Sequence, residues 1–215
     1  MSFLSIEKLC FGIQKLGLDL SDCQVKQLDL FSSMLFKWNK TYNLTSINGR
    51  DDILTHHILD SLAAAAELKK YVSNNSISLL DVGAGGGLPA IPLAITFPEY
   101  DINMVDTVGK KVAFQTQVIL TLKLKNAQAF HSRVETLNHT PYDVISSRAF
   151  SSLGDFVGLT QHLLKKGGFW FALKANVSEA EIATLGKEYK ISHLSKINVP
   201  FLNEERNIVL IQRIA

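Results

Sequence analysis

The sequence has few of the residues that build cross-linked or metal-bound folds. Only two cysteines occur among 215 residues, Cys10 and Cys23, and they lie outside any C-x-x-C motif and away from histidines at ligand spacing. This pattern argues against a disulfide scaffold and predicts no metal centre. We expect both thiols to be buried in a protein of the reducing cytoplasm.

Long hydrophobic runs are also lacking. No segment approaches the ~18 apolar residues that a membrane helix needs. The N-terminal stretch carries Glu7 and Lys8 where a signal peptide would be apolar throughout. We therefore expect a cytoplasmic protein without a membrane segment.

Charge of either sign is nearly balanced. The 22 Lys and Arg against 20 Asp and Glu give a formal charge of +2, and the sequence pI of about 8.5 is below the strongly basic range above ~9 that is typical of nucleic-acid-binding domains. The 47% of hydrophobic residues excludes a disordered chain. At ~150 residues per domain, the length predicts one core domain with an appendage.

The first third of the sequence has a helical period. Apolar residues recur at spacings of three and four, as at Leu9, Ile13 and Leu16. Two further helices are expected before residue 76, the last near residues 50–71. We assign residues 1–76 to a helical N-terminal extension and residues 77–215 to the core domain.

From residue 77 onward, short apolar runs alternate with helical periods. This rhythm predicts an α/β fold with a doubly wound, Rossmann-like, mostly parallel sheet. The last two strands follow one another without a helix, so they should be antiparallel. The seven expected strands lie in SLLDVG, INMVD, QAFHS, DVISSRAF and GGFWFALK and near residues 191–199 and 207–214.

The segment LLDVGAGGGLP is the most informative one, because a buried strand runs into four glycines and then a helix. Glycines permit positive φ and close backbone approach to a ligand, so the loop predicts a nucleotide cofactor. Two registers remain open. From Gly83 the pattern is G-x-G-x-G with Leu88 in place of a third glycine, whereas Gly85, Gly87 and Ala90 match G-x-G-x-x-A.

Polar residues follow the next strands. Asp106 ends the second strand and either binds the ribose hydroxyls of an adenosine or caps the helix that begins near Gly109. Glu135 and Arg148 follow the third and fourth strands. Because the carboxyl ends of parallel strands share one edge, we expect Asp81, Asp106, Glu135 and Arg148 to surround one pocket.

Several motifs together resemble one family, the bacterial glucose-inhibited division protein B family of guanine-N7 methyltransferases, which act on small-subunit ribosomal RNA. The resemblance extends from about residue 36 to the C-terminus. It implies a class I fold that binds S-adenosyl-L-methionine and modifies 16S rRNA, free or in the small-subunit particle, as a monomer. The motifs are WNKTYNLTSI, HHILDSL, LLDVGAGGGLPAIPLA, VDTVGKK, SRVE, SRAF, FALK and ERNIVLI.

The resemblance also implies site residues. The positions that would hold the methyl donor are Gly83, Leu88, Val134, Glu135 and Arg148, to which the residue-level argument adds Gly85 and Asp106. The resemblance further implies that Asn43 and Thr45 line the substrate pocket.

The residues can be tested against methylation chemistry. Attack at a pyrimidine C5 needs a cysteine nucleophile near the donor, and both cysteines lie far upstream. Methylation of an exocyclic amine usually accompanies an N-P-P-Y-like turn, but SSRAF stands there. Guanine N7 carries its own lone pair, so positioning and electrostatics suffice. We expect Arg148, Lys174 and Arg206 to be the catalytic group, with Lys174 and Arg206 contacting guanine O6 or phosphate.

Other features have simpler interpretations. Lys165 and Lys166 are expected at the C-terminal end of a helix over residues 152–165, where cations complement the helix dipole. His57, Asp60 and Ser61 are three and four residues apart, so we expect a hydrogen-bonded face that packs the extension against the cofactor crevice.

Two other functions remain open: a nicotinamide-dependent oxidoreductase, and a non-catalytic RNA-binding factor for ribosome assembly.

Overall fold

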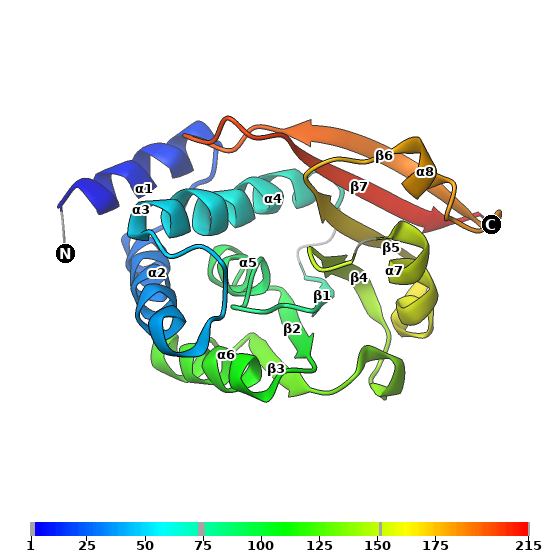
Figure 1. Ribbon diagram of the computed structural model, residues 1–215, viewed down its shortest axis with the longest axis horizontal. Helices are drawn as coiled ribbons and strands as arrows, with labels where there is room; N and C mark the ends of the chain where they lie inside the picture. The colour runs from blue at the N-terminus through cyan, green and yellow to red at the C-terminus, as the bar shows by residue number, and fades with distance from the viewer. Residues whose placement is uncertain (1–2, 73–75, 151, 215) are drawn as a thin grey trace.

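The computed structural model describes residues 3–72, 76–150 and 152–214, which form a seven-stranded sheet with helices on both faces (Figure 1). The strand order is β3-β2-β1-β4-β5-β7-β6, with β7 antiparallel to both of its neighbours. The α/β fold and the antiparallel last pair expected from the sequence are confirmed. The strands are β1 (Ser78–Val82), β2 (Asp101–Asp106), β3 (Ala127–His131), β4 (Tyr142–Ser147), β5 (Leu164–Lys174), β6 (Tyr189–Ile197) and β7 (Arg206–Arg213).

Helices precede the sheet and connect its parallel strands. The α-helices are α1 (Phe3–Lys15), α2 (Asp22–Tyr42), α3 (Arg50–Ile53), α4 (Asp60–Leu68), α5 (Ala90–Thr96), α6 (Gly109–Leu122), α7 (Leu153–Thr160) and α8 (Glu179–Ile182). Short 3₁₀ turns lie at Val134–Thr136 and Gln161–Leu163. None of the helices in the described part of the chain is long and apolar enough to cross a bilayer.

Alternating residues of each strand build two hydrophobic clusters, one on each face of the sheet. Leu79 on β1 and Phe171 on β5 belong to the cluster that also contains apolar residues of α1, α2, α4, α5 and α6. Leu80 and Trp170, which are adjacent to these residues on the same strands, belong to the cluster under α7. The N-terminal helices thus share one apolar core with the sheet.

The third N-terminal helical segment differs from a regular helix. It runs from α3 into α4 through a π-helical stretch at Leu54–Leu59, where each turn is wider. π-Helical turns are rare and are frequent at functional sites. This one contains His56 and His57, and Asp60 follows it directly.

Two expectations from the sequence are wrong. Lys165 and Lys166 lie at the start of β5, not at a helix end, because α7 stops at Thr160. Lys165 instead forms an ion pair with Asp143 at 2.9 Å. Both cysteines are exposed and not buried. The period of three and four that predicts their helices does not by itself show which side of each helix faces solvent.

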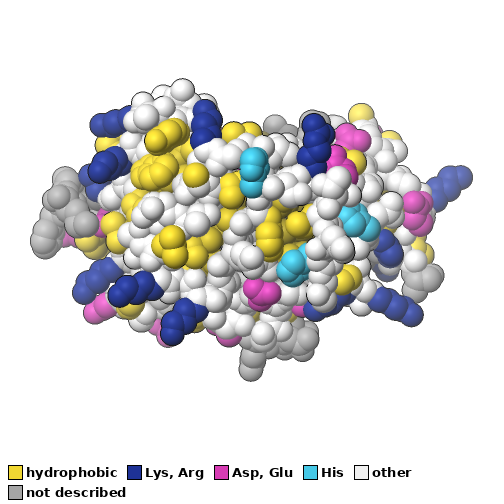
Figure 2. Space-filling view, turned by 90° about the horizontal axis from the view of Figure 1, so that it is seen from below, with side chains coloured by type: hydrophobic (Ala, Val, Ile, Leu, Met, Phe, Trp, Pro, Cys, Tyr) yellow, Lys and Arg dark blue, Asp and Glu magenta, His cyan; other side chains and the backbone are white. Residues whose placement is uncertain are grey.

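Charge on the surface is dispersed. On the face seen from below, Lys and Arg side chains lie in separate groups, mostly around the rim, and hydrophobic side chains are exposed between them (Figure 2). This distribution agrees with the small net charge. Any anionic ligand must therefore be recognised by local groups and not by the field of the whole molecule.

Candidate functional site

The glycine loop after β1 adopts a conformation that side chains would disturb. Gly83 has φ +71°, and a Cβ there would lie 2.7 Å from the Cβ of Ala149. Gly87 has φ +78°, and its Cβ would lie 2.5 Å from Cγ1 of Ile91. Positive φ is readily adopted only by glycine. The loop therefore needs glycine both for its backbone angles and for close packing.

Asp106 at the end of β2 fixes this loop. Its Oδ2 accepts a hydrogen bond from the backbone amide of Gly85 at 2.9 Å, and its Oδ1 accepts one from the amide of Val108 at 2.9 Å, just before α6. From the other side, the buried Gln115 donates its Nε2 to the carbonyl of Gly85 at 2.8 Å. Asp106 thus ties the glycine loop to the residue that precedes α6 and also lines the adjoining cavity.

A cavity of about 210 Å³ lies beside the loop, at the carboxyl ends of the first four strands. We call it the strand-end cavity. Its walls are largely apolar, and Asp106 and Glu135 supply two carboxylates. It is lined by Val82, Gly83, Val105, Asp106, Thr107, Ser132, Val134, Glu135, Ala149, Phe150 and Leu159.

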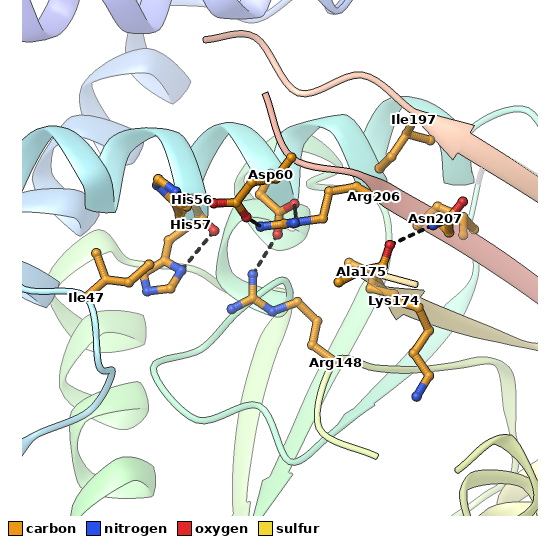
Figure 3. Close-up of a pocket in the computed structure, with 13 residues that line it drawn as sticks. Ile47, His56, His57, Asp60, Arg148, Lys174, Ala175, Ile197, Arg206 and Asn207 are labelled. Carbon is orange, nitrogen blue, oxygen red and sulfur yellow. Dashed lines mark hydrogen bonds and ion pairs between the residues drawn. The ribbon is translucent and has the colours of Figure 1, made fainter. Parts of the chain in front are cut away.

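A second cavity of about 480 Å³ lies between the N-terminal helices and the β5–β7 half of the sheet. We call it the arginine cavity, because Arg148 and Arg206 both line it. Figure 3 shows the two guanidinium groups meeting at Asp60. Arg148 donates from Nη1 to one carboxylate oxygen of Asp60 at 2.8 Å, and Arg206 donates from Nε to the other at 3.1 Å.

Asp60 is 5% exposed, so its charge is balanced by these two cations and not by water. Arg206 also donates from Nη2 to Glu204 at 2.8 Å and from Nη1 to the carbonyl of Glu205 at 2.9 Å. Among the residues that the structure describes, the guanidinium of Arg148 donates through Nη1 alone. Because a guanidinium has five N–H donors, Arg148 keeps donors for a ligand in the arginine cavity.

His57 lies at the edge of this cluster as a neutral imidazole. Its Nδ1 is 2.9 Å from the carbonyl of His56, so Nδ1 carries the proton. Its Nε2 therefore accepts from the hydroxyl of Thr45, at 2.7 Å. Burial, and then the positive charge of Arg148, lowers the pKa of His57 to about 4. The ring stays uncharged near neutral pH and adds no further positive charge beside the arginines.

Lys174 and Thr45, two other residues predicted from the sequence, lie where their side chains have partners. The ammonium of Lys174 donates to the carbonyl of Phe150 at 2.7 Å and pairs with Glu181, and its side chain extends away from Asp60 in Figure 3. Asn43 is the left-handed C-cap of α2. Thr45 reaches the arginine cavity only through its bond to His57.

The expectation that four polar residues surround one pocket is wrong. Asp106 and Glu135 line the strand-end cavity, whereas the guanidinium of Arg148 lies in the arginine cavity. The loop after β4 separates the two, because Ala149 and Phe150 turn toward the strand-end cavity. Leu88 is buried in the hydrophobic core.

Asp81, the fourth residue of that set, is fully buried under the loop. It accepts a hydrogen bond from the hydroxyl of Ser146 at 2.8 Å. Its other carboxylate oxygen has no partner among the described residues. Burial raises the pKa of Asp81 to about 8. This carboxyl is therefore largely protonated at neutral pH.

Two residues of the site, Gln115 and Glu204, do not follow from the sequence patterns described above. Gln115 is fully buried although it lies in an amphipathic helix, where glutamine usually indicates a solvent-facing position. Glu204 stands beside the predicted Arg206, and only the fold brings it within 3.3 Å of Nε2 of His56. Within residues 3–72, 76–150 and 152–214 there is no group of three or more potential metal ligands.

Comparisons with known proteins identify the family of this chain. The family model described as rRNA small subunit methyltransferase G matches residues 24–209. A ribosomal RNA small subunit methyltransferase G from Acidovorax sp. is 44% identical over 212 residues, covering 95% of this chain and 93% of the relative. One from Ralstonia nicotianae is 46% identical over 204 residues, covering 93% and 92%.

Solved structures match at the level of the fold. Magnesium protoporphyrin IX methyltransferase from Synechocystis, solved with bound S-adenosylmethionine, has a TM-score of 0.62 at 20% identity and covers 90% of this chain and 98% of its own. A ribosomal protein L11 methylase from Lactobacillus delbrueckii has a TM-score of 0.55 at 12% identity, covering 73% and 77%. With the match to the family model and the identity to its curated members, this chain belongs to the rRNA small subunit methyltransferase G family.

Proposed function

We propose that this chain transfers the methyl group of S-adenosyl-L-methionine to N7 of a guanine in 16S ribosomal RNA. The observation that carries the proposal is the position of Arg148 on the loop between the two cavities. Its guanidinium lies in the arginine cavity, and the next two residues form the wall of the strand-end cavity. A donor in one cavity and a base in the other would meet at this loop.

The strand-end cavity suits the adenosine part of S-adenosylmethionine. Val105, Val134 and Leu159 provide an apolar slot for the adenine ring, and the carboxylates of Asp106 and Glu135 are acceptors for hydroxyl and amine groups. A Cβ on Gly83 would reduce the space between Gly83 and Ala149, which both line this cavity. When bound, the cofactor supplies an electrophilic methyl group on a sulfonium cation.

The arginine cavity suits a guanine. Arginine donates two parallel hydrogen bonds to O6 and N7 of guanine when it reads DNA, and a single donor to O6 would leave N7 free to react. N7 carries an in-plane lone pair, so the chain needs no general base for it. We assign Arg148 and Arg206 to hold the base or its phosphate, and Asp60 to orient both arginines.

The substrate is proposed to be the ribosomal RNA itself or the small-subunit particle, met in the cytoplasm by the chain as a monomer. Lys174 is held by Phe150 and Glu181, so contact with RNA through its ammonium requires that ion pair to open. Lys174 also lines the arginine cavity, but its side chain extends away from Asp60, where the two arginines meet (Figure 3).

Two measurements test the proposal. Equilibrium titration should give saturable binding of S-adenosylmethionine and no binding of NAD, and the opposite result would favour the oxidoreductase alternative. Incubation with labelled S-adenosylmethionine and small-subunit RNA that lacks the modification should then transfer label to the RNA. Cofactor binding without transfer to either free or ribosome-bound RNA would favour a non-catalytic assembly factor.

A further inference from the structure

An exposed aromatic pair lies outside both cavities. Phe11 on α1 is 48% exposed and Phe201 in the loop between β6 and β7 is 52% exposed. Their ring centroids are 5.7 Å apart, with the planes tilted by 40°. Figure 1 shows that this loop extends from the sheet to α1. Two large aromatic rings thus meet at the surface and not in the core, where such rings usually contribute stability.

The backbone of Phe201 is strained. It has φ +65°, in the left-handed region. Pro200 and Phe201 are the central residues of a turn in which the amide of Leu202 donates to the carbonyl of Val199 at 3.1 Å. Glycine or asparagine is the favoured residue where such a turn requires positive φ at its third position. A bulky aromatic residue there is an outlier, and such outliers cluster at ligand sites.

Lysines accompany both rings. The Nζ of Lys8 is 5.3 Å from the ring centroid of Phe201, and that of Lys15 is 5.2 Å from the ring centroid of Phe11. Lys8 also forms an ion pair with the exposed Asp51, with 3.3 Å between Nζ and Oδ2. Exposed rings with cations beside them match what unpaired nucleotides require, because bases stack on the rings and phosphates attract the ammonium groups.

Positive charge continues next to the pair. Lys15 and Lys69 line a neighbouring surface cavity of about 460 Å³, and in the described part of the chain neither forms an ion pair. The same cavity shares Ile197 with the arginine cavity. The aromatic pair adjoins the neighbouring cavity through Lys15, and that cavity meets the arginine cavity at Ile197.

The loop itself connects the pair to the proposed substrate site. Phe201 is three residues from Glu204, which lines the arginine cavity, so their Cα atoms are at most ~11 Å apart. This separation suits nucleotides that flank a base held between the arginines. We propose that Phe11, Phe201, Lys8 and Lys15, here called the aromatic–lysine patch, bind unpaired nucleotides next to the target guanine. The inference rests on the proposed function for its substrate.

The test uses a double variant, Phe11→Ala with Phe201→Asn, in the full chain. Asparagine tolerates the left-handed region, so the loop keeps its conformation while both rings are lost. We expect the dissociation constant for protein-free 16S rRNA to rise about tenfold, since loss of a stacked base weakens binding by this order. The kcat at saturating RNA, the affinity for S-adenosylmethionine and the thermal midpoint should stay near wild-type values.

Two further variants serve as controls. Leu120→Ala removes another strongly exposed apolar side chain, on α6, and should leave RNA affinity unchanged. Phe11→Tyr with Phe201→Tyr keeps both rings and should bind RNA like the wild type.

Each outcome decides the inference. Wild-type affinity of the double variant for 16S rRNA would overturn it. Loss of binding only to assembled subunits would also overturn it and would assign the patch to a ribosomal protein. Failure of the wild type to bind 16S rRNA would overturn it directly. Methyl transfer by the wild type is measured in the same preparations, so failure of the proposed function is seen separately from failure of the patch.

Discussion

Asp60 on α4 accepts a hydrogen bond from Arg148 on the loop after β4, at 2.8 Å across 88 residues of sequence. This ion pair joins the N-terminal helices to the loop that separates the two cavities. Its carboxylate side chain is 7% exposed, and that of Arg148 is 25% exposed. The second oxygen of Asp60 holds Arg206, so one buried carboxylate sets the positions of both cations.

Asp60→Asn should therefore impair catalysis and stability together. The neutral amide of asparagine cannot balance the charges of two guanidinium groups. Breaking a buried ion pair costs about 3 kcal/mol, and solvent screening at the partly exposed arginines reduces this cost. We expect urea unfolding to show a loss of about 2 kcal/mol and turnover to fall about tenfold. Asp51→Asn, which removes an exposed pair with Lys8, should change neither quantity measurably. Wild-type turnover in Asp60→Asn would show that Asp60 does not position the arginines.

Arg148→Ala should lose methyl transfer and keep the fold. Removal of one preorganised donor at a reacting group lowers kcat about 100-fold. The affinity for S-adenosylmethionine should change less, because the guanidinium lies outside the strand-end cavity. Single-turnover transfer and cofactor titration measure the two effects. Lys187→Ala, which removes an exposed lysine in the turn before β6, is the control. Normal turnover in Arg148→Ala contradicts the assigned role.

Gly85→Val should weaken cofactor binding at least tenfold. Gly85 has φ +56°, and its Cβ would meet no protein atom closer than 3.9 Å. The effect therefore comes from the strained backbone of a β-branched residue, which would distort the loop beside the strand-end cavity. Gly17 has φ +66° with open space around it. Gly17→Val imposes the same strain elsewhere, so equal cofactor affinities in the two variants would disprove the role of the loop.

His57 should make the protein less stable in acid. Its pKa in the folded chain is about 4 against an ordinary value of 6.5, so the unfolded chain binds a proton first as the pH falls. The stabilisation is complete above about pH 7 and is lost as the pH falls toward 4. His57→Gln keeps an acceptor for Thr45 and should show a flatter dependence. Denaturant unfolding between pH 4 and 7 measures both slopes, and parallel slopes would contradict the neutral imidazole.

Much of the fold and part of the site follow from local sequence patterns. The strand periods and the glycine run place Gly83, Asp106 and Glu135 correctly at one edge, because parallel strands end together. The direction of a side chain after a strand is not encoded locally. The sequence therefore predicts one pocket for Arg148, Asp106 and Glu135, whereas the guanidinium of Arg148 lies in a second cavity. Lys174 lines the arginine cavity, but its ammonium pairs with Glu181, and no local pattern indicates this partner.

The central claim is that this chain makes N7-methylguanosine in 16S ribosomal RNA. The most direct measurement is nucleoside mass spectrometry of small-subunit RNA from cells with and without the protein, with the modified fragment mapped by nuclease digestion. We expect one N7-methylguanosine to be lost with the protein and to be restored by the wild type but not by Arg148→Ala. An unchanged N7-methylguanosine content of 16S rRNA in cells that lack the protein would contradict it.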